Sequence, residues 1–416
     1  MTPRSPHRRF GALAIVVLLL LGGLCGCRPF PAETIRSDVL AVPAPYYNAL
    51  FAGTGGGWSG GDGTLSIGLE GGISVWLFGD SFLGEVSAGG GRSRNSPFIR
   101  NCIVIQDDRS LSTRFGMTDG GPSAFFAAER KDEWFWPGDG TVQGSELKIF
   151  LHRFREASDA PWGWEQAGNA MATLSLPALK IQGIRELNRK EGILFGVSLV
   201  EDDAVTYIYH TLDRAHPKAA LLSQAPAGCL DCPWLHFTGN GWSGSGGQWF
   251  PVLTGVSTQY SVIREDKSFY LFTMDGRTPL SPDIVVYRSA KPTGPWRGPV
   301  TLYTAPEADD KTAAYNPFVH TQFTTDGNDL IVSYNLNPIG DPEALYRNAS
   351  SYRPRFIRVD FAGVEERFGE AEKARGSRLE VRRKTDQNRF SRHWPGRASR
   401  NRSASGWPPA LRVSQN

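Results

Sequence analysis

Residues Trp58–Ser81 read WSGGDGTLSIGLEGGISVWLFGDS, which is the pattern of a β-hairpin with a carboxylate at each free end. Leu65–Leu69 and Ile73–Phe78 are apolar-rich runs separated by a glycine-containing turn, as expected for two antiparallel strands. Asp62 precedes the first run and Asp80 follows the second, so antiparallel pairing predicts that the two carboxylates share one rim. Paired carboxylates hydrolyse glycosidic bonds, although Gly-Asp-Gly alone is also ordinary turn chemistry.

The motif GDGT occurs again at Gly138–Thr141, directly after an aromatic run that includes Trp136. A second hairpin signal follows it, which a chance turn would not explain well. We therefore expect the two corners to meet across one opening, with Asp62 and Asp139 as neighbouring acids. The sequence predicts Asp62, Asp139 and Asp80 as the catalytic carboxylates.

Residues 51–365 are rich in Gly and aromatic residues and show short alternating strands with almost no helical periodicity. The strand pairs group into five units, and hairpin turns such as Thr325–Asn328 punctuate them. Five four-stranded units predict an all-β fold, a five-bladed β-propeller whose central channel collects residues at the inner strand ends. A pair of β-sandwich domains is the alternative, which the even spacing of the units disfavours.

The N-terminus predicts export. Basic residues precede the apolar run Ala12–Leu21, which is too short to span a membrane comfortably and fits a signal-peptide core. Leu24-Cys25-Gly26-Cys27 follows and resembles a bacterial lipobox, in which Cys27 would receive the lipid (palmitate or a similar chain). A plain secretory signal is the alternative. We expect residues 1–27 to be a lipoprotein signal peptide and the mature protein to lie in the bacterial cell envelope, anchored to a membrane surface.

The formal net charge of +3 conceals two different regions. Residues 28–374 hold 31 basic and 40 acidic residues, whereas the chain from Arg375 onward holds eleven basic and two acidic ones. An acidic body is unsuited to nucleic acid, which requires clustered Lys and Arg. We expect residues 28–50 to be a linker and residues 366–416 a basic, disordered tail. That tail is either solvated or in contact with an anionic lipid or polymer.

The cysteines of CLDC, Cys229 and Cys232, would form a disulfide in an exported chain or remain two thiols. A zinc site is disfavoured because no second ligand pair follows. We expect no cofactor and no metal, and nothing in the sequence supports a central cation such as calcium.

The chain resembles the five-bladed-propeller glycoside hydrolases of the arabinanase and β-fructosidase group. It is more closely similar to a family of uncharacterised bacterial exported propellers related to endo-D-arabinofuranases. The residues that carry the resemblance are Trp58–Phe82, WPGDGT at Trp136–Thr141 and the meander Ser261–Trp296. The resemblance implies that Asp62, which opens the first blade, is a base or nucleophile.

Asp80 and Asp139 match the repeated motif. Each would be either the acid that acts with Asp62 or a charge that shifts the pKa of the acid. The general acid stays open, with Glu146, Glu186 and Glu191 as further candidates.

Aromatic, amide and cationic side chains near the predicted rim are candidates for sugar binding. Aromatic rings stack on sugar C–H faces and Arg forks bind hydroxyls, while packing between sheets is the alternative for each ring. Trp242 lies in a glycine-rich stretch and is expected on an exposed loop over the channel mouth. The predicted substrate-binding residues are Trp58, Trp136, Arg94, Asn95, Trp242, Gln259, Tyr260, Asn316 and His320.

Gln259, Tyr260, Asn316 and His320 are expected at the channel entrance because they open the fourth and fifth units.

The sequence thus predicts an exported lipoprotein glycoside hydrolase that acts on a polysaccharide or oligosaccharide, of a furanoside-containing, arabinan-like type. The alternative is a non-catalytic surface propeller that binds a glycan or a protein partner, because one fold serves both functions.

Overall fold

The structure of the chain, a computed structural model, describes residues 35–36, 40–53, 56–158, 163–187, 191–244, 247–323 and 329–375. The chain divides into two units, Met1–Phe368 and Gly369–Asn416. In the second unit the described residues, 369–375, are helical. The expected signal peptide and its Cys27 lie outside the described residues. Within the described ranges, no helix is long and apolar enough to cross a membrane.

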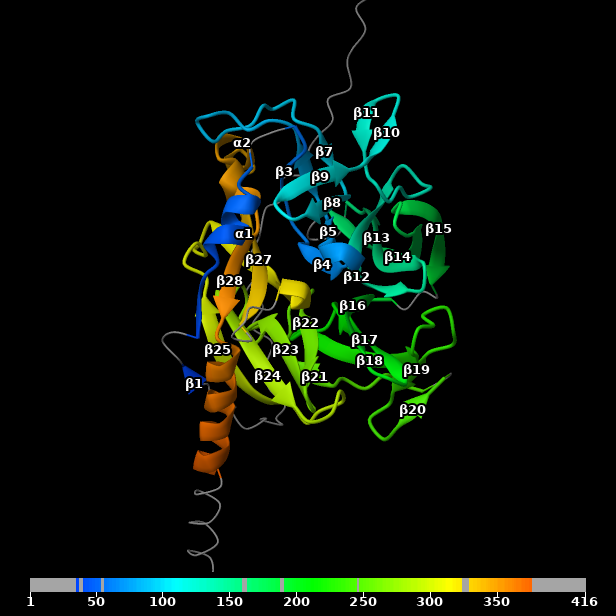
Figure 1. Ribbon diagram of the computed structural model, residues 1–416, viewed down its shortest axis with the longest axis vertical. Helices are drawn as coiled ribbons and strands as arrows, with labels where there is room; N and C mark the ends of the chain where they lie inside the picture. The colour runs from blue at the N-terminus through cyan, green and yellow to red at the C-terminus, as the bar shows by residue number, and fades with distance from the viewer. Residues whose placement is uncertain are drawn as a thin grey trace, which may run out of the picture. The chain divides into compact units, whose positions relative to one another are not determined.

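The first unit is built from β-sheets, as the all-β prediction requires. In the described ranges, five sheets have four or more strands, and Figure 1 shows them following one another around the unit in chain order. The first sheet contains β4 (Leu65–Gly68), β5 (Ser74–Phe78), β8 (Cys102–Asp107) and β9 (Ser110–Arg114), and the second contains β12 (Glu133–Gln143), β13 (Glu146–Glu156), β14 (Trp164–Ser175) and β15 (Lys180–Leu187). The third sheet contains β16 (Ile193–Glu201), β17 (Val205–Leu212), β18 (Ala219–Pro226), β19 (Leu235–Phe237), β20 (Trp242–Ser243) and β21 (Leu253–Thr254). The fourth sheet contains β22 (Ser261–Glu265), β23 (Ser268–Met274), β24 (Asp283–Ser289), β25 (Arg297–Thr304) and β1 (Ile35–Arg36), and the fifth contains β26 (Thr312–Val319), β27 (Leu330–Pro338), β28 (Arg355–Val359) and β2 (Ala41–Pro43).

Smaller elements connect these sheets. They are the strands β3 (Trp58–Gly61), β6 (Ser81–Leu83), β7 (Phe98–Ile99), β10 (Gly116–Thr118) and β11 (Gly121–Ser123), the α-helices α1 (Pro45–Leu50) and α2 (Ala344–Arg347), and the 3₁₀ helices η1 (Glu70–Gly72), η2 (Thr321–Phe323) and η3 (Ala349–Tyr352). Strands β3, β6 and β7 form one three-stranded sheet, and β10 pairs with β11.

Strand β5 shows why the strands read as apolar runs. All five of its residues are buried, and successive side chains point to opposite faces of the sheet. Leu77 packs in a cluster with Leu151 of the second sheet, whereas Trp76 and Phe78 pack with Phe356 of the fifth sheet. A strand covered on both faces therefore needs apolar residues at consecutive positions.

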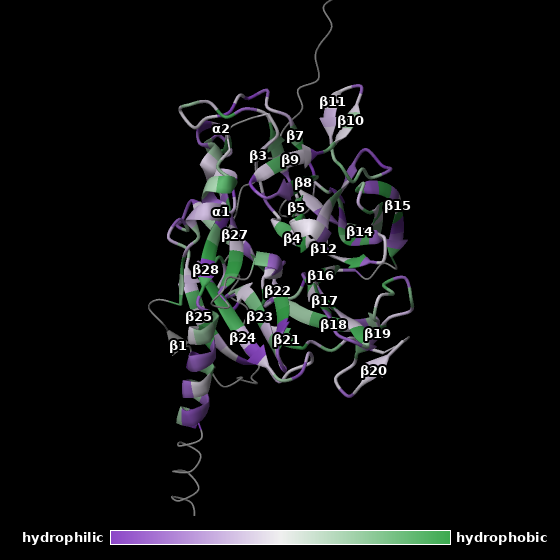
Figure 2. Ribbon diagram, viewed as in Figure 1, coloured by the Kyte–Doolittle hydropathy of each residue, from purple (hydrophilic) through white to green (hydrophobic). Residues whose placement is uncertain are grey.

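Similar apolar clusters join the second sheet to the third, the third to the fourth and the fourth to the fifth. Figure 2 shows hydrophobic residues gathered in the strands, with many hydrophilic residues in the connecting loops. Polar contacts also link the fifth sheet to the first: the Thr64 hydroxyl donates to Asn335 Oδ1 at 2.6 Å, and Ser66 Oγ lies 2.6 Å from His320 Nδ1. The packing thus runs from each sheet to the next and from the last to the first.

Part of the expected linker is ordered. Strand β2 pairs with β28, and α1 follows it with Asn48 hydrogen-bonded to the backbone of Phe356. Residues 361–368, at the end of the first unit, are helical and cross the expected start of the tail at residue 366. Phe361, Val364 and Phe368 are buried in the cluster of the fourth and fifth sheets, which explains why this segment is ordered.

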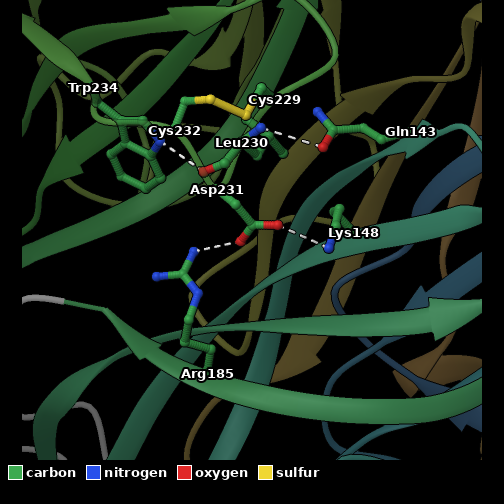
Figure 3. The surroundings of a disulfide bond; sticks show 8 residues. All are labelled: Gln143, Lys148, Arg185, Cys229, Leu230, Asp231, Cys232 and Trp234. Atoms are coloured by element: carbon green, nitrogen blue, oxygen red, sulfur yellow. Dashed lines mark hydrogen bonds and ion pairs between the residues drawn. A yellow bond between two sulfur atoms is a disulfide. The ribbon is translucent and has the colours of Figure 1, made fainter.

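Cys229 and Cys232 form a disulfide in the connection between β18 and β19 (Figure 3). The loop that it closes is attached to the second sheet, since the Leu230 N–H donates to Gln143 Oε1 at 3.2 Å. Asp231 in the same loop forms ion pairs with Lys148 and Arg185. The disulfide loop is therefore a contact between the second and third sheets.

Candidate functional site

Asp62 and Asp80 lie side by side where the first hairpin opens. Asp62 stands between β3 and β4, and Asp80 between β5 and β6. The Asp62 N–H donates to the Asp80 carbonyl at 3.2 Å, and the Gly79 N–H donates to the Asp62 carbonyl at 2.7 Å. A Cβ at Gly79 would lie 2.9 Å from Asp62 Oδ1, so glycine is required there for the carboxyl to sit against the neighbouring backbone. We call these two carboxyls the Asp62–Asp80 pair.

Asp80 is held by a cation and by an indole. Arg100 Nη1 forms an ion pair with Asp80 Oδ2 at 3.1 Å, and Trp136 Nε1 donates to Asp80 Oδ1 at 2.9 Å. The Arg100 guanidinium lies 4.1 Å from the centre of the Trp134 ring, which orients it. Burial raises the pKa of Asp80, while Arg100 and Trp136 oppose that rise. The Asp80 side chain keeps 16% of its surface exposed, so it remains accessible.

Asp62 is held by two tyrosines. The Tyr315 hydroxyl donates to Asp62 Oδ2 at 2.7 Å, and the Tyr352 hydroxyl is also hydrogen-bonded to this carboxyl. Burial raises the pKa of Asp62 to about 7; the nearby charge of Asp80 adds to the rise, and the tyrosine hydrogen bonds oppose it. The two carboxyls of the pair therefore differ in their electrostatic surroundings, because only Asp80 has a cationic partner in the described part of the chain.

Asp139 does not join the pair. It lies within β12, where Oδ1 accepts the Gly140 N–H and Oδ2 accepts the Leu199 N–H, both at 2.8 Å. Burial raises the pKa of Asp139 to about 7, and the charged neighbour that adds to this is Glu201. The expectation that Asp62 and Asp139 are neighbouring acids is thus not met. Asp139 instead joins the innermost strands of the second and third sheets.

The two predicted tryptophans near the pair differ in role. Trp136 is half-buried and reaches Asp80 with its indole N–H, while its ring makes a T-shaped contact with Trp164, with centroids 5.0 Å apart. Trp58 is 8% exposed and packs against Phe78, so it belongs to the core. Trp136 therefore stays a candidate for substrate contact, and Trp58 does not present an open ring face.

Three of the predicted substrate-binding residues make contacts that do not involve the Asp62–Asp80 pair. Arg94 is exposed and forms an ion pair with Glu343, and Asn95 is exposed in the same turn. Trp242 is not in an exposed loop as expected. It forms strand β20 and packs, half-buried, against Phe237, because its glycine-rich neighbours form the bends that flank this short strand.

The residues expected at the channel entrance are largely buried. Tyr260 is fully buried and donates to the His210 carbonyl at 2.7 Å. His320 is 1% exposed, lies against Trp76, and burial lowers its pKa to about 3. Both are therefore core residues, since their apolar ring contacts outweigh the polarity that suggested an open position.

Gln259 and Asn316 are members of a chain of hydrogen bonds between sheets. Gln259 Nε2 donates to the Pro137 carbonyl at 3.0 Å, and Asn316 Nδ2 donates to Gln259 Oε1 at 2.9 Å. Asn335 Nδ2 then donates to the Asn316 carbonyl, and Thr64 donates to Asn335. These amides thus link the second, fifth and first sheets near Asp62.

The candidate glutamates are paired elsewhere. Glu146, Glu186 and Glu191 form ion pairs with Lys148, Arg153 and Arg214, respectively. None of these contacts involves the Asp62–Asp80 pair. Among the described residues, no group of three or more His, Cys, Asp or Glu side chains could hold a metal ion.

Sequence reasoning missed Arg100 and Tyr352. The position of Arg100 follows from strand pairing. Cys102 pairs with Phe78, and the same antiparallel register continued by two residues sets Arg100 opposite Asp80. Tyr352 gave no such signal, since it lies in η3, far along the chain from Asp62.

One family model matches most of this chain. The family described as "Domain of unknown function (DUF5005)" matches residues 45–384, and the chain belongs to this family. No curated protein matches.

Among solved structures, a Bacteroides ovatus protein provisionally described as a hydrolase has 21% identity and a TM-score of 0.67, covering 77% of this chain and 90% of its own. It shows the fold that this chain shares. An α-L-arabinofuranosidase from Podospora anserina, in complex with cellotriose, has 9% identity and a TM-score of 0.44, with 74% and 94% of the two chains covered. An exo-β-1,3-galactanase from Phanerochaete chrysosporium has 12% identity and a TM-score of 0.41, covering 74% of this chain and 64% of that one.

Proposed function

We propose that this member of the DUF5005 family is a glycoside hydrolase whose reacting carboxyls are the Asp62–Asp80 pair. The observation that carries the proposal is the inequality of two adjacent, partly accessible carboxyls, one paired with Arg100 and the other with tyrosine hydroxyls. Glycoside hydrolysis requires one carboxylic acid and one carboxylate at the same site, and unequal surroundings keep one of each at neutral pH.

The proposed architecture is a five-bladed β-propeller. Five sheets of four or more strands in the described ranges support it, as do the apolar clusters that join each sheet to the next and the last to the first. In a propeller, the innermost strands of the blades surround a central channel. The loops at the ends of these strands meet at the channel opening, where such a fold carries a binding site.

The proposed location and substrate follow from the sequence. The apolar run and Cys27 at the N-terminus support an exported lipoprotein on the cell envelope, and the acidic body supports a neutral polymer rather than nucleic acid. The resemblance to arabinanase-type enzymes supports a furanoside-containing polysaccharide. Metabolic labelling with palmitate tests the anchor: the wild type incorporates label, and Cys27→Ala does not. Label retained in that variant would disprove lipidation at Cys27.

A polysaccharide digestion screen tests the activity. Wild type, Asp62→Asn, Asp80→Asn and the exposed control Asp132→Asn are incubated with arabinan, arabinogalactan, levan and xylan, and new reducing ends are measured. We expect product from wild type and control, and about 10²–10⁴-fold less from the two variants of the pair. Equal product from all four proteins would remove the pair from the chemistry.

The absence of product from every substrate would favour the alternative, a surface protein that binds glycan without cleaving it. Retention of the same polysaccharides on immobilised protein would then identify the ligand.

A further inference from the structure

We propose that Asp62 is the proton donor of the pair and Asp80 its ionised partner, with Tyr352 positioning the donor. This assignment rests on the proposed function. It reverses the role that the family resemblance implies for Asp62, namely base or nucleophile.

The contacts of Asp80 favour its ionised form. Arg100 is a permanent cation, and the indole N–H of Trp136 is a donor only, so neither group accepts a hydrogen bond from a protonated carboxyl. Protonation of Asp80 would lose the ion pair and leave the partially buried Arg100 without its counter-charge. A carboxyl between a cation and a donor therefore keeps its negative charge.

The contacts of Asp62 suit a carboxylic acid. The hydroxyls of Tyr315 and Tyr352 can donate to a carboxylate and can also accept from an acid O–H, so both contacts survive protonation. In the described part of the chain, no Lys, Arg or His forms an ion pair with Asp62. The charge of Asp80 beside it also penalises a second negative charge, and the raised pKa of Asp62 is in line with this.

Tyr352 is held in place by its neighbour in the chain. Arg353 donates to the carbonyls of Ser59, Ala52 and Gly53, at 2.8, 3.0 and 2.9 Å, and thereby attaches η3 to the strand that leads to Asp62. A Cβ at Gly60 would lie 2.7 Å from the Tyr352 carbonyl, so the two backbones are in close contact. The phenol of Tyr352 is thus presented to Asp62 by a fixed backbone.

The proposed reaction transfers one proton from Asp62 and breaks one glycosidic bond. The proton of Asp62 moves to the glycosidic oxygen while the bond from that oxygen to C1 breaks, and its electron pair stays on the leaving oxygen. In a single displacement, Asp80 takes a proton from the water that adds to C1. In a double displacement, Asp80 first forms a bond to C1. Water then adds to C1 as the Asp80–C1 bond breaks, its electron pair returns to the Asp80 carboxylate, and Asp62 takes the proton of that water. Asp62 is the proton donor in both cases.

Leaving-group dependence tests the assignment. The substrate found in the digestion screen is compared with an aryl glycoside of the same sugar, whose nitrophenol departs without protonation. We expect Asp62→Asn to lose about 10²–10⁴-fold of kcat/KM on the polysaccharide but less than 10-fold on the aryl glycoside. Asp80→Asn should lose activity equally on both. The opposite pattern would assign the donor to Asp80 and overturn the proposal.

Tyr352→Phe tests the positioning role through the pH profile. It removes a hydrogen bond to the Asp62 carboxylate, so the pKa of Asp62 should rise and the basic limb of kcat/KM should move upward by about one pH unit. Tyr303→Phe, which changes a phenol of β25 away from the pair, should leave the limb unmoved. An unchanged limb in Tyr352→Phe would show that Tyr352 is only structural.

A titration of the side-chain carboxyls by ¹³C NMR does not depend on activity. We expect the carboxyl that disappears in Asp62→Asn to titrate near pH 7, and the one that disappears in Asp80→Asn to titrate at lower pH. A reversed order would disprove the inference even in an active enzyme. Inactivity on all substrates with the expected order would instead disprove the proposed function alone.

Discussion

The sequence GDGT occurs at two corners of this chain, and the two corners have different backbones. At Asp62 the motif joins β3 to β4, and Gly63 and Thr64 adopt positive φ angles of 94° and 44°. At Asp139 it lies inside β12, where the pairing with β13 shifts register between Pro137 and Gly140. The same four residues therefore form a corner in one place and a bulged strand in the other.

The surroundings of the two aspartates differ in the same way. Asp62 meets tyrosine hydroxyls and a second carboxyl, whereas both oxygens of Asp139 accept backbone N–H groups. Burial raises the pKa of both aspartates to about 7, so a raised pKa alone does not distinguish a reacting group from a structural one. The two roles are distinguished by whether the carboxylate oxygens are occupied by backbone N–H groups and by whether a second carboxyl lies beside them.

The largest expected difference between the corners is in activity. Asp62→Asn should reduce kcat/KM about 10²–10⁴-fold because it removes a reacting carboxyl, with little change in Tm. Asp139→Asn should mainly lower Tm, because an amide cannot accept from both N–H groups. Activity per folded molecule and thermal unfolding of both variants measure this. A comparable loss of activity in folded Asp139→Asn would return Asp139 to the site.

The next effect is on stability. Gly138→Ala should lower the free energy of unfolding by about 1–3 kcal/mol, because its Cβ would lie 2.7 Å from the Gly196 carbonyl in the third sheet. Gly144→Ala, a change at a positive φ angle with open space around the Cβ, serves as the control for backbone strain alone. Denaturant unfolding of both variants measures the difference. A smaller loss of stability in Gly138→Ala than in Gly144→Ala would show that the second and third sheets shift to accommodate the added Cβ.

A smaller effect concerns the indole on Asp80. Trp136→Phe removes one hydrogen bond to Asp80 and should reduce kcat/KM about 10-fold, with the acidic limb of the profile moved to higher pH. Trp296→Phe, at an indole just before β25, is the matched control, because the Trp296 N–H has no hydrogen-bond partner among the described residues. Equal profiles in the two variants would show that the Trp136 N–H does not tune Asp80.

The two corners should also share a pH dependence of stability, which does not distinguish them. The folded-state pKa values of Asp62 and Asp139 lie above those of the unfolded chain. The stability that each contributes is therefore fully present below about pH 4 and is lost as the pH rises toward 7, with a slope on the order of 1 kcal/mol per pH unit for each carboxyl. Unfolding of wild type between pH 4 and 8 measures it, and either Asn variant should flatten the slope.

Local patterns were sufficient for the first hairpin. Alternation around a glycine turn predicts that the start of one strand lies beside the end of the next, and Asp62 and Asp80 are adjacent as that pattern requires. The paired register would also have indicated Arg100, since it continues along the neighbouring strand. Burial of alternate residues of β5 in different clusters likewise follows from the unbroken apolar run.

Contacts between distant segments were beyond such patterns. The polarity of His320 and the aromatic character of Trp58 suggested open positions, but packing between sheets buries both side chains. Tyr315 and Tyr352 reach Asp62 only because the fifth sheet packs against the first.

Short-range geometry in this protein follows from residue order, because hairpin pairing and side-chain alternation involve neighbours in the chain. Thus the strands, the β-rich fold and the adjacency of Asp62 and Asp80 could be read from the amino acids alone. The difference between Asp62 and Asp139 could not. It depends on which groups from other sheets come to lie against each carboxyl, and that is established only when the sheets pack together and water is excluded.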